Sequence, residues 1–403
     1  MRKIEGVSIL KVLLNDGLEQ EGINLFKKFG IKTDTEKRNP KALVTDIGQF
    51  DALVVRSATK VTREVLETGA KGNLKIVGRA GVGYDNIDVE AASEKGIVVK
   101  SAPYGNTNAV AELTICMMLS VSRKIPQSHE SLKKGVWTKE KFKGTEIAFK
   151  TLGILGCGKI GQRVGEIARR GFDMDVIGYD LRPCPESSIK YVSKEEVLKR
   201  SDYLSIHTGG KEVVVGEKEL SMMKPTAYLI NTSRGANVDE DALLNALQKG
   251  KIVGAALDVY SEEPKNEGAE FKNKLASLDN MVLSSHLGAS TVEAQTETSI
   301  EIARVVANYL QGGDFANAVN AGESIELEER PVYTLFIHHR DVPGVFANID
   351  QVLADNDINI RANYSRQIGK SGYAISVYVI HKKVGPKIID TLRQIENVTS
   401  VRV

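Results

Sequence analysis

The sequence predicts an α/β protein with two doubly wound parallel-sheet domains and a small ferredoxin-like domain at its C-terminus. Three observations carry this prediction. Short apolar runs alternate with amphipathic helical segments as far as residue 310, which is typical of parallel sheets whose strands are joined by helices. One of these runs leads directly into a glycine-rich turn. Residues 331–403 then follow the order β-α-β-β-α-β, which is the ferredoxin-like arrangement.

Length and composition narrow the class of protein. A chain of 403 residues exceeds what one hydrophobic core supports and predicts two to four domains. A net charge of +2 favours neither a nucleic-acid nor a membrane partner. No segment is apolar over the length of a signal peptide or a membrane span. Three cysteines without a CxxC pair indicate neither a disulfide framework nor a metal site, so we expect a cytoplasmic protein.

The N-terminal domain is predicted to consist of two separated segments, residues 1–106 and 291–318. Short apolar runs mark its buried strands, and the amphipathic segments between them mark its helices. A helical stretch at 291–310 is expected to pack back onto this sheet. The predicted strands are 11–14, 52–55, 74–77 and 97–99, and the predicted helices are 18–29, 63–68 and 89–95.

Residues 107–290 predict a second, Rossmann-like domain that begins with a helix at 108–123. Further strands are expected at 176–179, 203–206, 228–231, 253–257 and 281–283, with a helix at 239–248. Residues 319–330 are acidic towards their end and lack a sustained period, so they are predicted to be a linker. In the C-terminal domain the predicted strands are 332–338, 358–366, 373–380 and 398–403, and the helices are 344–356 and 387–395.

A nucleotide-binding loop is predicted at the start of the second domain. Gly156, Gly158 and Gly161 form G-x-G-x-x-G between an apolar strand and a helix. In this motif the first glycine allows a tight turn, the second lets the backbone approach a pyrophosphate, and the third lets the helix pack on the strand. The N-terminus of that helix offers free N–H groups to the phosphate.

Asp180 refines the prediction to NAD. It ends the next predicted strand, 19 residues after Gly161. A carboxylate at this place binds both ribose hydroxyls and repels a 2′-phosphate. Arg182 stands two residues later, so the preference for NAD over NADP is not absolute.

Ionisable side chains follow three later strand ends, where parallel sheets bind their ligands. Arg234 follows the run 228–231, Asp258 and Glu263 follow 253–257, and His286 follows 281–283. Oxidation of a secondary alcohol needs a base for the hydroxyl proton while a hydride leaves, and histidine can act as that base near neutral pH. A carboxylate would fix the tautomer of this histidine, and an arginine would hold a substrate carboxylate by two hydrogen bonds.

With these residues the chain resembles the D-2-hydroxyacid dehydrogenases, most closely those that act on 3-phospho-D-glycerate and carry a C-terminal ACT domain. The resemblance runs nearly end to end. It implies that Arg234 binds the substrate carboxylate and carbonyl, that Glu263 partners the histidine, and that His286 is the acid/base, with spacings of 29 and 23 residues that fit the family. The motifs are VVRSATKVT, VGRAGVGYDNID, GNTNAVAELT, LGILGCGKIG, NTSRGANVDE, AALDVYSEEP and SHLGAST.

The resemblance also implies the remaining ligand contacts. Asp258 is expected to contact the nicotinamide amide, and Arg56 an anionic group of the substrate. Lys139 and Lys141 are candidates for its phosphate. One departure is that residues 209–211 read Gly-Gly-Lys where the family usually has a proline and leucines, so the loop over the cofactor is expected to differ in shape. The expected cofactor-binding residues are Gly156, Gly158, Lys159, Ile160, Gly161, Asp180, His207, Thr208, Thr232, Ser233, Arg234, Asp258, His286 and Gly288, and the substrate-binding residues are Arg56, Ser57, Gly81, Val82, Asn106, Lys139 and Lys141.

Residues 331–403 resemble an ACT domain, a module that binds small ligands, often amino acids, at a paired interface. By resemblance, His339, Asp341 and Asn359 are expected to bind L-serine as a regulatory effector. Asp341 stands where these dehydrogenases have an asparagine. It can accept hydrogen bonds from serine but cannot donate one to the serine carboxylate, so weak inhibition is expected. The alternative is an ACT domain that serves assembly only. Two pairing domains suggest a homo-oligomer, a tetramer or a dimer.

Three functions remain open at this stage. The favoured one is NAD-dependent oxidation of 3-phosphoglycerate to 3-phosphohydroxypyruvate, the first step of phosphorylated serine biosynthesis. A glyoxylate or hydroxypyruvate reductase would use the same three residues but does not usually carry an ACT domain. A corepressor that senses NADH would bind the cofactor without catalysis. The ACT domain and Arg56 favour the first of these.

Overall fold

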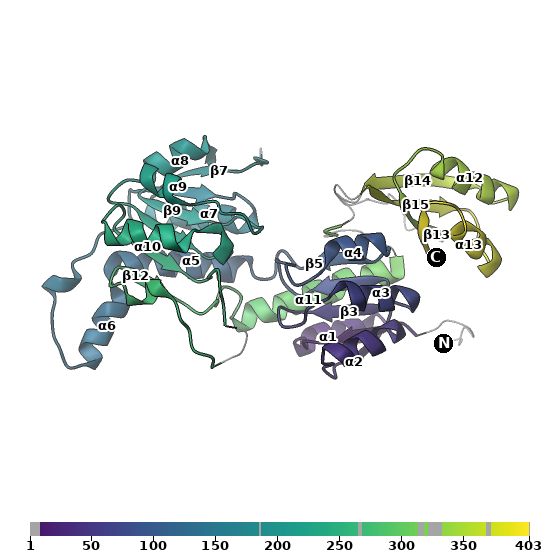
Figure 1. The fold of residues 1–403 in the computed structure, drawn as a ribbon, viewed down its shortest axis with the longest axis horizontal. Helices are drawn as coiled ribbons and strands as arrows, with labels where there is room; N and C mark the ends of the chain where they lie inside the picture. The colour runs from purple at the N-terminus through teal and green to yellow at the C-terminus, as the bar shows by residue number, and fades with distance from the viewer. Residues whose placement is uncertain are drawn as a thin grey trace. The chain divides into compact units, whose positions relative to one another are not determined.

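The computed structural model describes residues 9–184, 187–264, 268–312, 318–320, 333–367 and 372–402. The chain forms two compact units (Figure 1). The first comprises Met1–Gly105 and Gln295–Val403, and the second comprises Asn106–Ala294.

The first unit contains a five-stranded sheet in which every neighbouring pair is parallel. The strand order is β2-β1-β3-β4-β5, the flavodoxin-like order of doubly wound folds. The strands are β1 (Lys11–Leu14), β2 (Lys32–Asp34), β3 (Ala52–Val55), β4 (Ile76–Arg79) and β5 (Val98–Ser101). The helices are α1 (Gln20–Lys28), α2 (Pro40–Asp46), α3 (Arg63–Lys71), α4 (Val89–Glu94) and the long helix α11 (Val292–Gly312).

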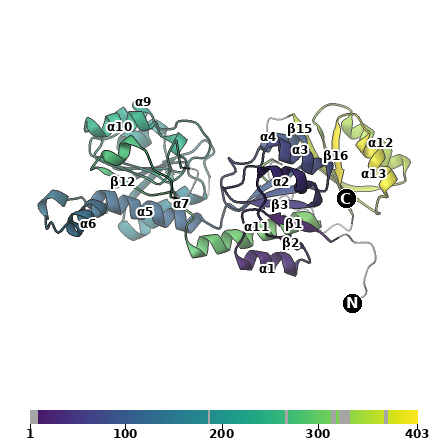
Figure 2. The ribbon, with the colours of Figure 1, turned by 60° about the horizontal axis from the view of Figure 1, so that its bottom comes forward.

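Both faces of this sheet are buried, because successive side chains of each strand point to opposite sides. Val12 and Val54 face α1 and α11, where Ile302 and Val306 complete the layer. The alternate residues, such as Leu13, pack with α2, α3 and α4 in a second buried cluster. Figure 2 shows α1 and α11 below the sheet and α2 and α3 above it.

The C-terminal part of the first unit is a four-stranded antiparallel sheet in the order β14-β15-β13-β16. One face of this sheet is covered by its own two helices, with Leu335, Ile349 and Leu392 in the shared core. On the other face Phe336, Ile375 and Val377 join the cluster that contains Ile302 of α11. The elements are β13 (Thr334–Arg340), α12 (Val345–Asp355), β14 (Ile360–Gln367), β15 (Tyr373–Ile380), α13 (Pro386–Arg393) and β16 (Val398–Arg402).

The second unit contains a seven-stranded parallel sheet in the order β12-β11-β10-β9-β6-β7-β8. Counted from β6, six of these strands have the dinucleotide-binding order 3-2-1-4-5-6, and the order reverses between β6 and β9. The strands are β6 (Thr151–Leu155), β7 (Asp175–Tyr179), β8 (Lys190–Tyr191), β9 (Tyr203–Ile206), β10 (Tyr228–Asn231), β11 (Gly254–Leu257) and β12 (Met281–Leu283).

Helices cover both faces of this second sheet. On one face α5 (Thr107–Arg123) and α7 (Lys159–Phe172) pack on Ile154 and Ile230. On the other, α8 (Lys194–Arg200), α9 (Glu217–Met222) and α10 (Glu240–Gln248) pack on Leu204 and Leu229. Helix α6 (Ile125–Lys133) continues from α5 and has no buried residue.

The predicted fold class is confirmed, with differences in the short elements. Strands β2 and β8 and helices α2, α6, α8 and α9 were not predicted. Strand β2 reads Lys-Thr-Asp and β8 has two residues, so neither presents an apolar run. The missed helices have six to nine residues and bury at most two residues each, so their apolar faces are weak.

Candidate active site

The second unit joins a histidine and a carboxylate from two neighbouring strand ends. The ring Nδ1 of His286, after β12, lies 2.8 Å from Oε2 of Glu263, after β11. The backbone of His286 has a φ of 57°, a left-handed conformation that few residues with a side chain adopt. Its N–H donates to the carbonyl of Asp258 at 2.9 Å, which helps to hold this conformation.

The pair is electrostatically coupled. The hydrogen bond with Glu263 raises the pKa of His286; burial opposes this shift, and the negative charges of Glu263 and Asp258 add to it. Burial alone would raise the pKa of Glu263, but its hydrogen bond with His286 and the nearby positive charge outweigh burial, and the pKa is lowered. Arg234 acts on both groups through its charge. The arrangement therefore favours an ionised carboxylate beside a histidine that can hold a proton near neutral pH.

Asp258 is fully buried and holds the loop that carries His286. Its Oδ1 accepts hydrogen bonds from Ser284 Oγ at 2.6 Å and from the N–H of Leu287 at 2.8 Å. Its Oδ2 accepts one from the N–H of Gly288 at 3.0 Å. These three donors fix residues 284–288, so Asp258 positions the histidine in addition to any contact it makes with a ligand.

The loop after β10 presents Arg234 and is shaped by Asn231. The amide of Asn231 donates to the carbonyl of Arg234 at 2.9 Å, and its Oδ1 accepts from Ser233 Oγ at 2.8 Å. Gly235 follows, where a Cβ atom would lie 1.9 Å from the carbonyl carbon of Tyr260. The loops that follow β10 and β11 therefore meet backbone to backbone at Gly235, which brings Arg234 and Glu263 to one edge of the sheet.

A cavity of about 880 Å³ opens beside the pair, with His286 and Glu263 in its wall. Tyr260 and Phe271 stack edge to face in the same wall, with ring centroids 4.6 Å apart. The hydroxyl of Tyr260 lies 2.9 Å from the carbonyl oxygen of Leu257 and 2.8 Å from that of Ser284, between which its single proton is shared. A mainly apolar recess with two coupled ionisable groups is suited to acid–base chemistry on a small polar molecule.

The glycine-rich turn lies at the point where the strand order reverses. Gly156 has a φ of 91°, and a Cβ there would lie 2.7 Å from the carbonyl carbon of His207. A Cβ on Gly161 would lie 2.3 Å from the carbonyl oxygen of Gly156. Gly158, by contrast, precedes α7 and has no atom within 4 Å of its ideal Cβ position. The first and third glycines serve internal packing, and the second leaves space in front of the helix N-terminus for a phosphate.

Asp180 ends β7 beside this turn. Its Oδ2 accepts from the N–H of Cys157 at 2.7 Å, and its Oδ1 accepts from the N–H of Arg182 at 2.8 Å. Each oxygen keeps a lone pair for a further donor such as a ribose hydroxyl. Cys157 is buried, and burial followed by the charge of Asp180 raises the pKa of its thiol to about 12. Its thiol is therefore a packing group and no nucleophile.

The end of β9 completes the cofactor-binding edge. Burial lowers the pKa of His207 to about 4, so its ring is neutral, and its Nε2 lies 2.8 Å from Ser205 Oγ. The buried Oγ1 of Thr208 has no hydrogen-bond partner among the described residues. Such an atom, together with the open space at Gly158, fits a bound dinucleotide. Gly209 and Gly210 also have open space at their ideal Cβ positions.

The other expected cofactor-binding residues lie on the same edge. Lys159 and Ile160 form the first turn of α7. Thr232 and Ser233 follow β10, where Thr232 Oγ1 lies 2.8 Å from Thr114 Oγ1 of α5. A Cβ on Gly288 would lie 3.3 Å from Val110. The structure thus gathers the whole cofactor set in the second unit.

The expected substrate-binding residues are divided between the units. In the first unit Arg56 and Ser57 follow β3, and Gly81 and Val82 follow β4, at the carboxyl edge of that sheet. Arg56 Nη2 lies 3.4 Å from both Glu19 Oε1 and Ser299 Oγ, while its buried Nε has no hydrogen-bond partner among the described residues. That guanidinium therefore keeps donor capacity for a ligand.

Asn106, Lys139 and Lys141 belong to the second unit. Asn106 precedes α5 and makes no capping hydrogen bond, and its buried Oδ1 has no partner within the described ranges. Lys139 and Lys141 lie in an exposed segment after α6, with the Lys141 ammonium 6.0 Å from the centre of the Phe142 ring.

The three expected regulatory residues do not meet within one chain. His339 is 1% exposed on the helix-covered face of its sheet, with Nε2 2.8 Å from Ser376 Oγ and Nδ1 donating to the carbonyl of Arg340. Asp341 follows β13 and accepts a hydrogen bond from Gln367 at the end of β14. Asn359 precedes the start of β14, at the opposite end of that strand. A strand of this length spans about 25 Å, so one serine cannot bridge all three residues in a single domain.

Several residues that build the site were not predicted. Asn231, Gly235, Tyr260 and Ser284 shape the loops that carry Arg234, Glu263 and His286. The Asn-Thr-Ser-Arg-Gly run does carry a turn signal, because an asparagine side chain readily bonds the backbone two or three residues later. Tyr260 and Ser284 give no such signal, since their contacts join different strand ends.

Two kinds of feature do not occur in the described ranges. No helix there has the length and apolar character needed to cross a bilayer. No cluster of histidine, cysteine and acidic side chains there has the geometry of a metal site.

Comparisons with known proteins agree with this architecture. Residues 115–288 match the NAD binding domain of the D-isomer specific 2-hydroxyacid dehydrogenases, and residues 333–397 match the ACT domain. A D-3-phosphoglycerate dehydrogenase of Methanocaldococcus jannaschii is 41% identical over 321 residues, which are 77% of this chain and 60% of that protein. A hydroxypyruvate reductase of Thermotoga maritima is 41% identical over 299 residues, 72% of this chain and 95% of that protein.

Solved structures show the same likeness. The crystal structure of a glyoxylate reductase from Paecilomyes thermophila superposes with a TM-score of 0.69 at 29% identity, covering 78% of this chain and 99% of that one. A D-lactate dehydrogenase from Aquifex aeolicus, complexed with NAD and lactic acid, superposes with a TM-score of 0.65 at 28% identity, covering 75% and 96%. The chain spans only 50–60% of the length of the first three D-3-phosphoglycerate dehydrogenases that it matches.

Proposed function

The chain belongs to the family of D-isomer-specific 2-hydroxyacid dehydrogenases, and from that premise we propose that it oxidises 3-phospho-D-glycerate to 3-phosphohydroxypyruvate with NAD. The observation that carries the proposal is the hydrogen bond between His286 and Glu263 on the wall of a cavity. The relatives named D-3-phosphoglycerate dehydrogenase, at 38–41% identity, support this choice of substrate.

In this proposal His286 is the residue that accepts and donates the hydroxyl proton of the substrate. With Nδ1–H donating to Glu263, the other ring nitrogen is left to accept the hydroxyl proton of the substrate. The Glu263 carboxylate stabilises the imidazolium that results, and Arg234 binds the substrate carboxylate. The chemistry that NAD supplies when bound is acceptance of a hydride from the substrate carbon that carries the hydroxyl group. In the reverse direction His286 donates its proton to the carbonyl oxygen.

The cofactor is held by the carboxyl edge of the second sheet. The backbone N–H groups at Gly158 and at the start of α7 face the pyrophosphate, and Asp180 binds the ribose hydroxyls. Thr208 would bond the cofactor through its buried hydroxyl.

The remaining assignments are part of the same proposal. Arg56, Ser57, Gly81, Val82 and Asn106 bind the substrate, and Lys139 and Lys141 its phosphate. The substrate-binding domain comprises 1–106 and 291–318, the cofactor domain 107–290, and the ACT domain 331–403 after a linker at 319–330. The three free cysteines are consistent with a cytoplasmic protein.

We further propose a homo-oligomer that is regulated by L-serine. Exposed apolar side chains gather along and after α6, with Ile125 56% and Trp137 85% exposed, and an apolar groove of about 490 Å³ on α5 adjoins them. An exposed apolar surface of this kind is suited to packing against a second copy of the chain. Because His339 and Asn359 lie at opposite ends of their sheet, a serine site would need residues from two ACT domains.

A substrate panel tests the proposed function. The purified protein is incubated with 3-phosphoglycerate, glycerate, glycolate and lactate, each with NAD and with NADP, and reduced cofactor is followed at about 340 nm. We expect the highest kcat/KM for 3-phosphoglycerate with NAD. Preference for glycerate or glycolate would identify a hydroxypyruvate or glyoxylate reductase instead, and cofactor binding without turnover of any acid would support the corepressor alternative.

A further inference from the structure

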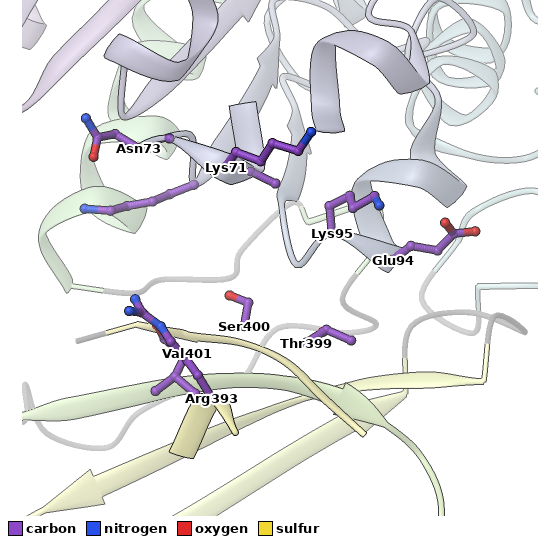
Figure 3. Close-up of a pocket in the computed structure, with 11 residues that line it drawn as sticks. Lys71, Asn73, Glu94, Lys95, Arg393, Thr399, Ser400 and Val401 are labelled. Atoms are coloured by element: carbon purple, nitrogen blue, oxygen red, sulfur yellow. The ribbon is translucent and has the colours of Figure 1, made fainter. Parts of the chain in front are cut away.

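A second cavity, distinct from the active site, lies wholly within the first unit. It has a volume of about 690 Å³, within the range of small-molecule sites. One wall comes from the end of α3 and from α4, and the facing wall from α13 and β16 of the ACT domain (Figure 3). Its lining residues are Ala70, Lys71, Gly72, Asn73, Lys75, Glu94, Lys95, Arg393, Thr399, Ser400 and Val401.

The lining of this cavity is strongly cationic. It includes three lysines and one arginine but a single acid, Glu94. Glu94 is already bound by Arg63, with Oε2 2.6 Å from Nη1, and a hydrogen bond with that arginine lowers the pKa of Glu94. Among the lining residues themselves, four positive side chains therefore face one negative side chain that is already paired.

Three of the four lining cations form ion pairs with carboxylates that lie outside the cavity lining. Lys75 pairs with Asp51 at 3.2 Å and Lys95 with Glu67 at 3.3 Å, and both lysine side chains are 35% exposed. Arg393 pairs with Asp390 at 3.2 Å, donates through Nη2 to the carbonyl of Val401 at 3.3 Å, and is 55% exposed. Because ion pairs that are partly open to solvent contribute little, an anion in the cavity can compete for the cations or share them.

The two walls are held together next to the cavity. A Cβ on Gly96 would lie 2.8 Å from Ser400 Cβ and 3.0 Å from His338 Cγ, so the turn after α4 touches the ACT sheet closely. Phe336 of the same sheet packs against Tyr309 of α11, with ring centroids 6.3 Å apart. Asn73 and Ser400 add neutral hydrogen-bond donors to the lining. Together these contacts keep cations from both walls around one space.

We propose that this cavity is a binding site for a small polyanion, carrying phosphate or carboxylate groups, that bridges the substrate-binding and ACT parts of the chain. The site goes beyond the proposed function, because none of its lining residues belongs to the catalytic, cofactor or serine sets. A ligand there contacts Lys71, Lys75 and Lys95 on one side and Arg393 on the other. By binding both walls it stabilises their association over their separation.

Calorimetric titration of the full chain tests the site, with pyrophosphate as the phosphate probe and citrate as the carboxylate probe in separate arms. The double variant Lys95→Ala/Arg393→Ala removes one cation from each wall. We expect it to weaken binding of at least one probe by roughly tenfold or more, since each charge-assisted hydrogen bond contributes about that factor. The control Lys41→Ala, an exposed lysine of α2, should stay within about twofold of the unaltered chain.

A further variant separates this site from the active site. Lys139→Ala/Lys141→Ala should keep the binding that Lys95→Ala/Arg393→Ala weakens, because those lysines belong to the proposed substrate phosphate site and not to this cavity. Melting curves establish that each variant folds, and Lys95→Gln/Arg393→Gln replaces the alanine pair if that pair does not. No heat with either probe up to about 10 mM, or a loss in the Lys139/Lys141 variant with none in the Lys95/Arg393 variant, would overturn the proposal. Turnover of 3-phosphoglycerate is measured in a separate assay, so the polyanion site and the proposed dehydrogenase activity can each be disproved without the other.

Discussion

The ring of His286 is oriented by a carboxylate at Nδ1 and lies in the wall of a cavity. His286→Ala should lower turnover by roughly a hundredfold or more, because the hydroxyl proton then has no base. Cofactor binding, followed by fluorescence titration of NADH, should stay nearly unchanged. His129→Ala, at an exposed position on α6, is the matched control. Unchanged turnover in the His286 variant would remove that residue from the mechanism.

Glu263 raises the pKa of His286 and so determines the pH range in which His286 can act as a base. Oxidation needs the neutral ring, so its rate should rise with pH through the pKa of His286, which Glu263 holds above its ordinary value near 6.5. In Glu263→Gln the carboxylate charge is gone, the pKa of His286 falls, and the acidic limb of the kcat profile should move to lower pH. Glu262→Gln, an exposed neighbour, should not move it. A limb that stays in place would contradict the pairing.

Asp180 should decide between NAD and NADP. Asp180→Asn removes the charge that repels a 2′-phosphate, and its single amide oxygen still accepts from one of the two N–H groups, those of Cys157 and Arg182, that Asp180 binds. The ratio of kcat/KM with NAD to kcat/KM with NADP should fall by about tenfold. Asp175→Asn, at the start of the same strand, is the control. If the unaltered protein already prefers NADP, this interpretation of Asp180 is wrong.

At the scale of elements, the site depends on how closely the ends of β10 and β11 approach each other. A methyl group on Gly235 would meet the Tyr260 backbone at 1.9 Å, so Gly235→Ala must push the two loops apart. Overpacking of this kind costs about 1–3 kcal/mol. We expect a lower melting temperature and a fall in kcat/KM of roughly tenfold or more, as Arg234 and Glu263 separate.

The same methyl group placed elsewhere should be harmless. Gly171→Ala, late in α7, meets no atom within 4 Å and should leave both activity and melting temperature unchanged or slightly raised. Equal effects of the two substitutions would show that the contact between the loops is not what positions Arg234.

At the scale of the whole molecule, regulation by serine should require two chains. His339 and Asp341 lie near one end of their sheet and Asn359 at the other, so inhibition should weaken as dilution separates the subunits. We expect weak inhibition by L-serine in an activity titration, strengthened in Asp341→Asn because an amide can donate to the serine carboxylate. Flat titrations for both proteins, with no calorimetric heat of binding, would leave the ACT domain with an assembly role only.

The sequence by itself determined the fold class, because alternating apolar runs and helical periods report burial directly. It also located Gly156, Asp180, Arg234, Glu263 and His286 at strand ends, since parallel sheets collect their functional groups at one edge. Short polar elements such as β2 escaped prediction, because three residues carry no period.

Tertiary structure alone decided how these residues are held. Asp258 looks like a ligand contact in the sequence, yet its buried carboxylate also fixes the loop of His286 through three hydrogen bonds. His339 looks like an effector ligand, yet its ring is buried beside Ser376. The cationic cavity brings Lys71, Lys75 and Lys95 together with Arg393, which is about 300 positions away in the chain. Contacts between residues so far apart in the sequence depend on how the elements pack, and no local pattern in the sequence records that packing.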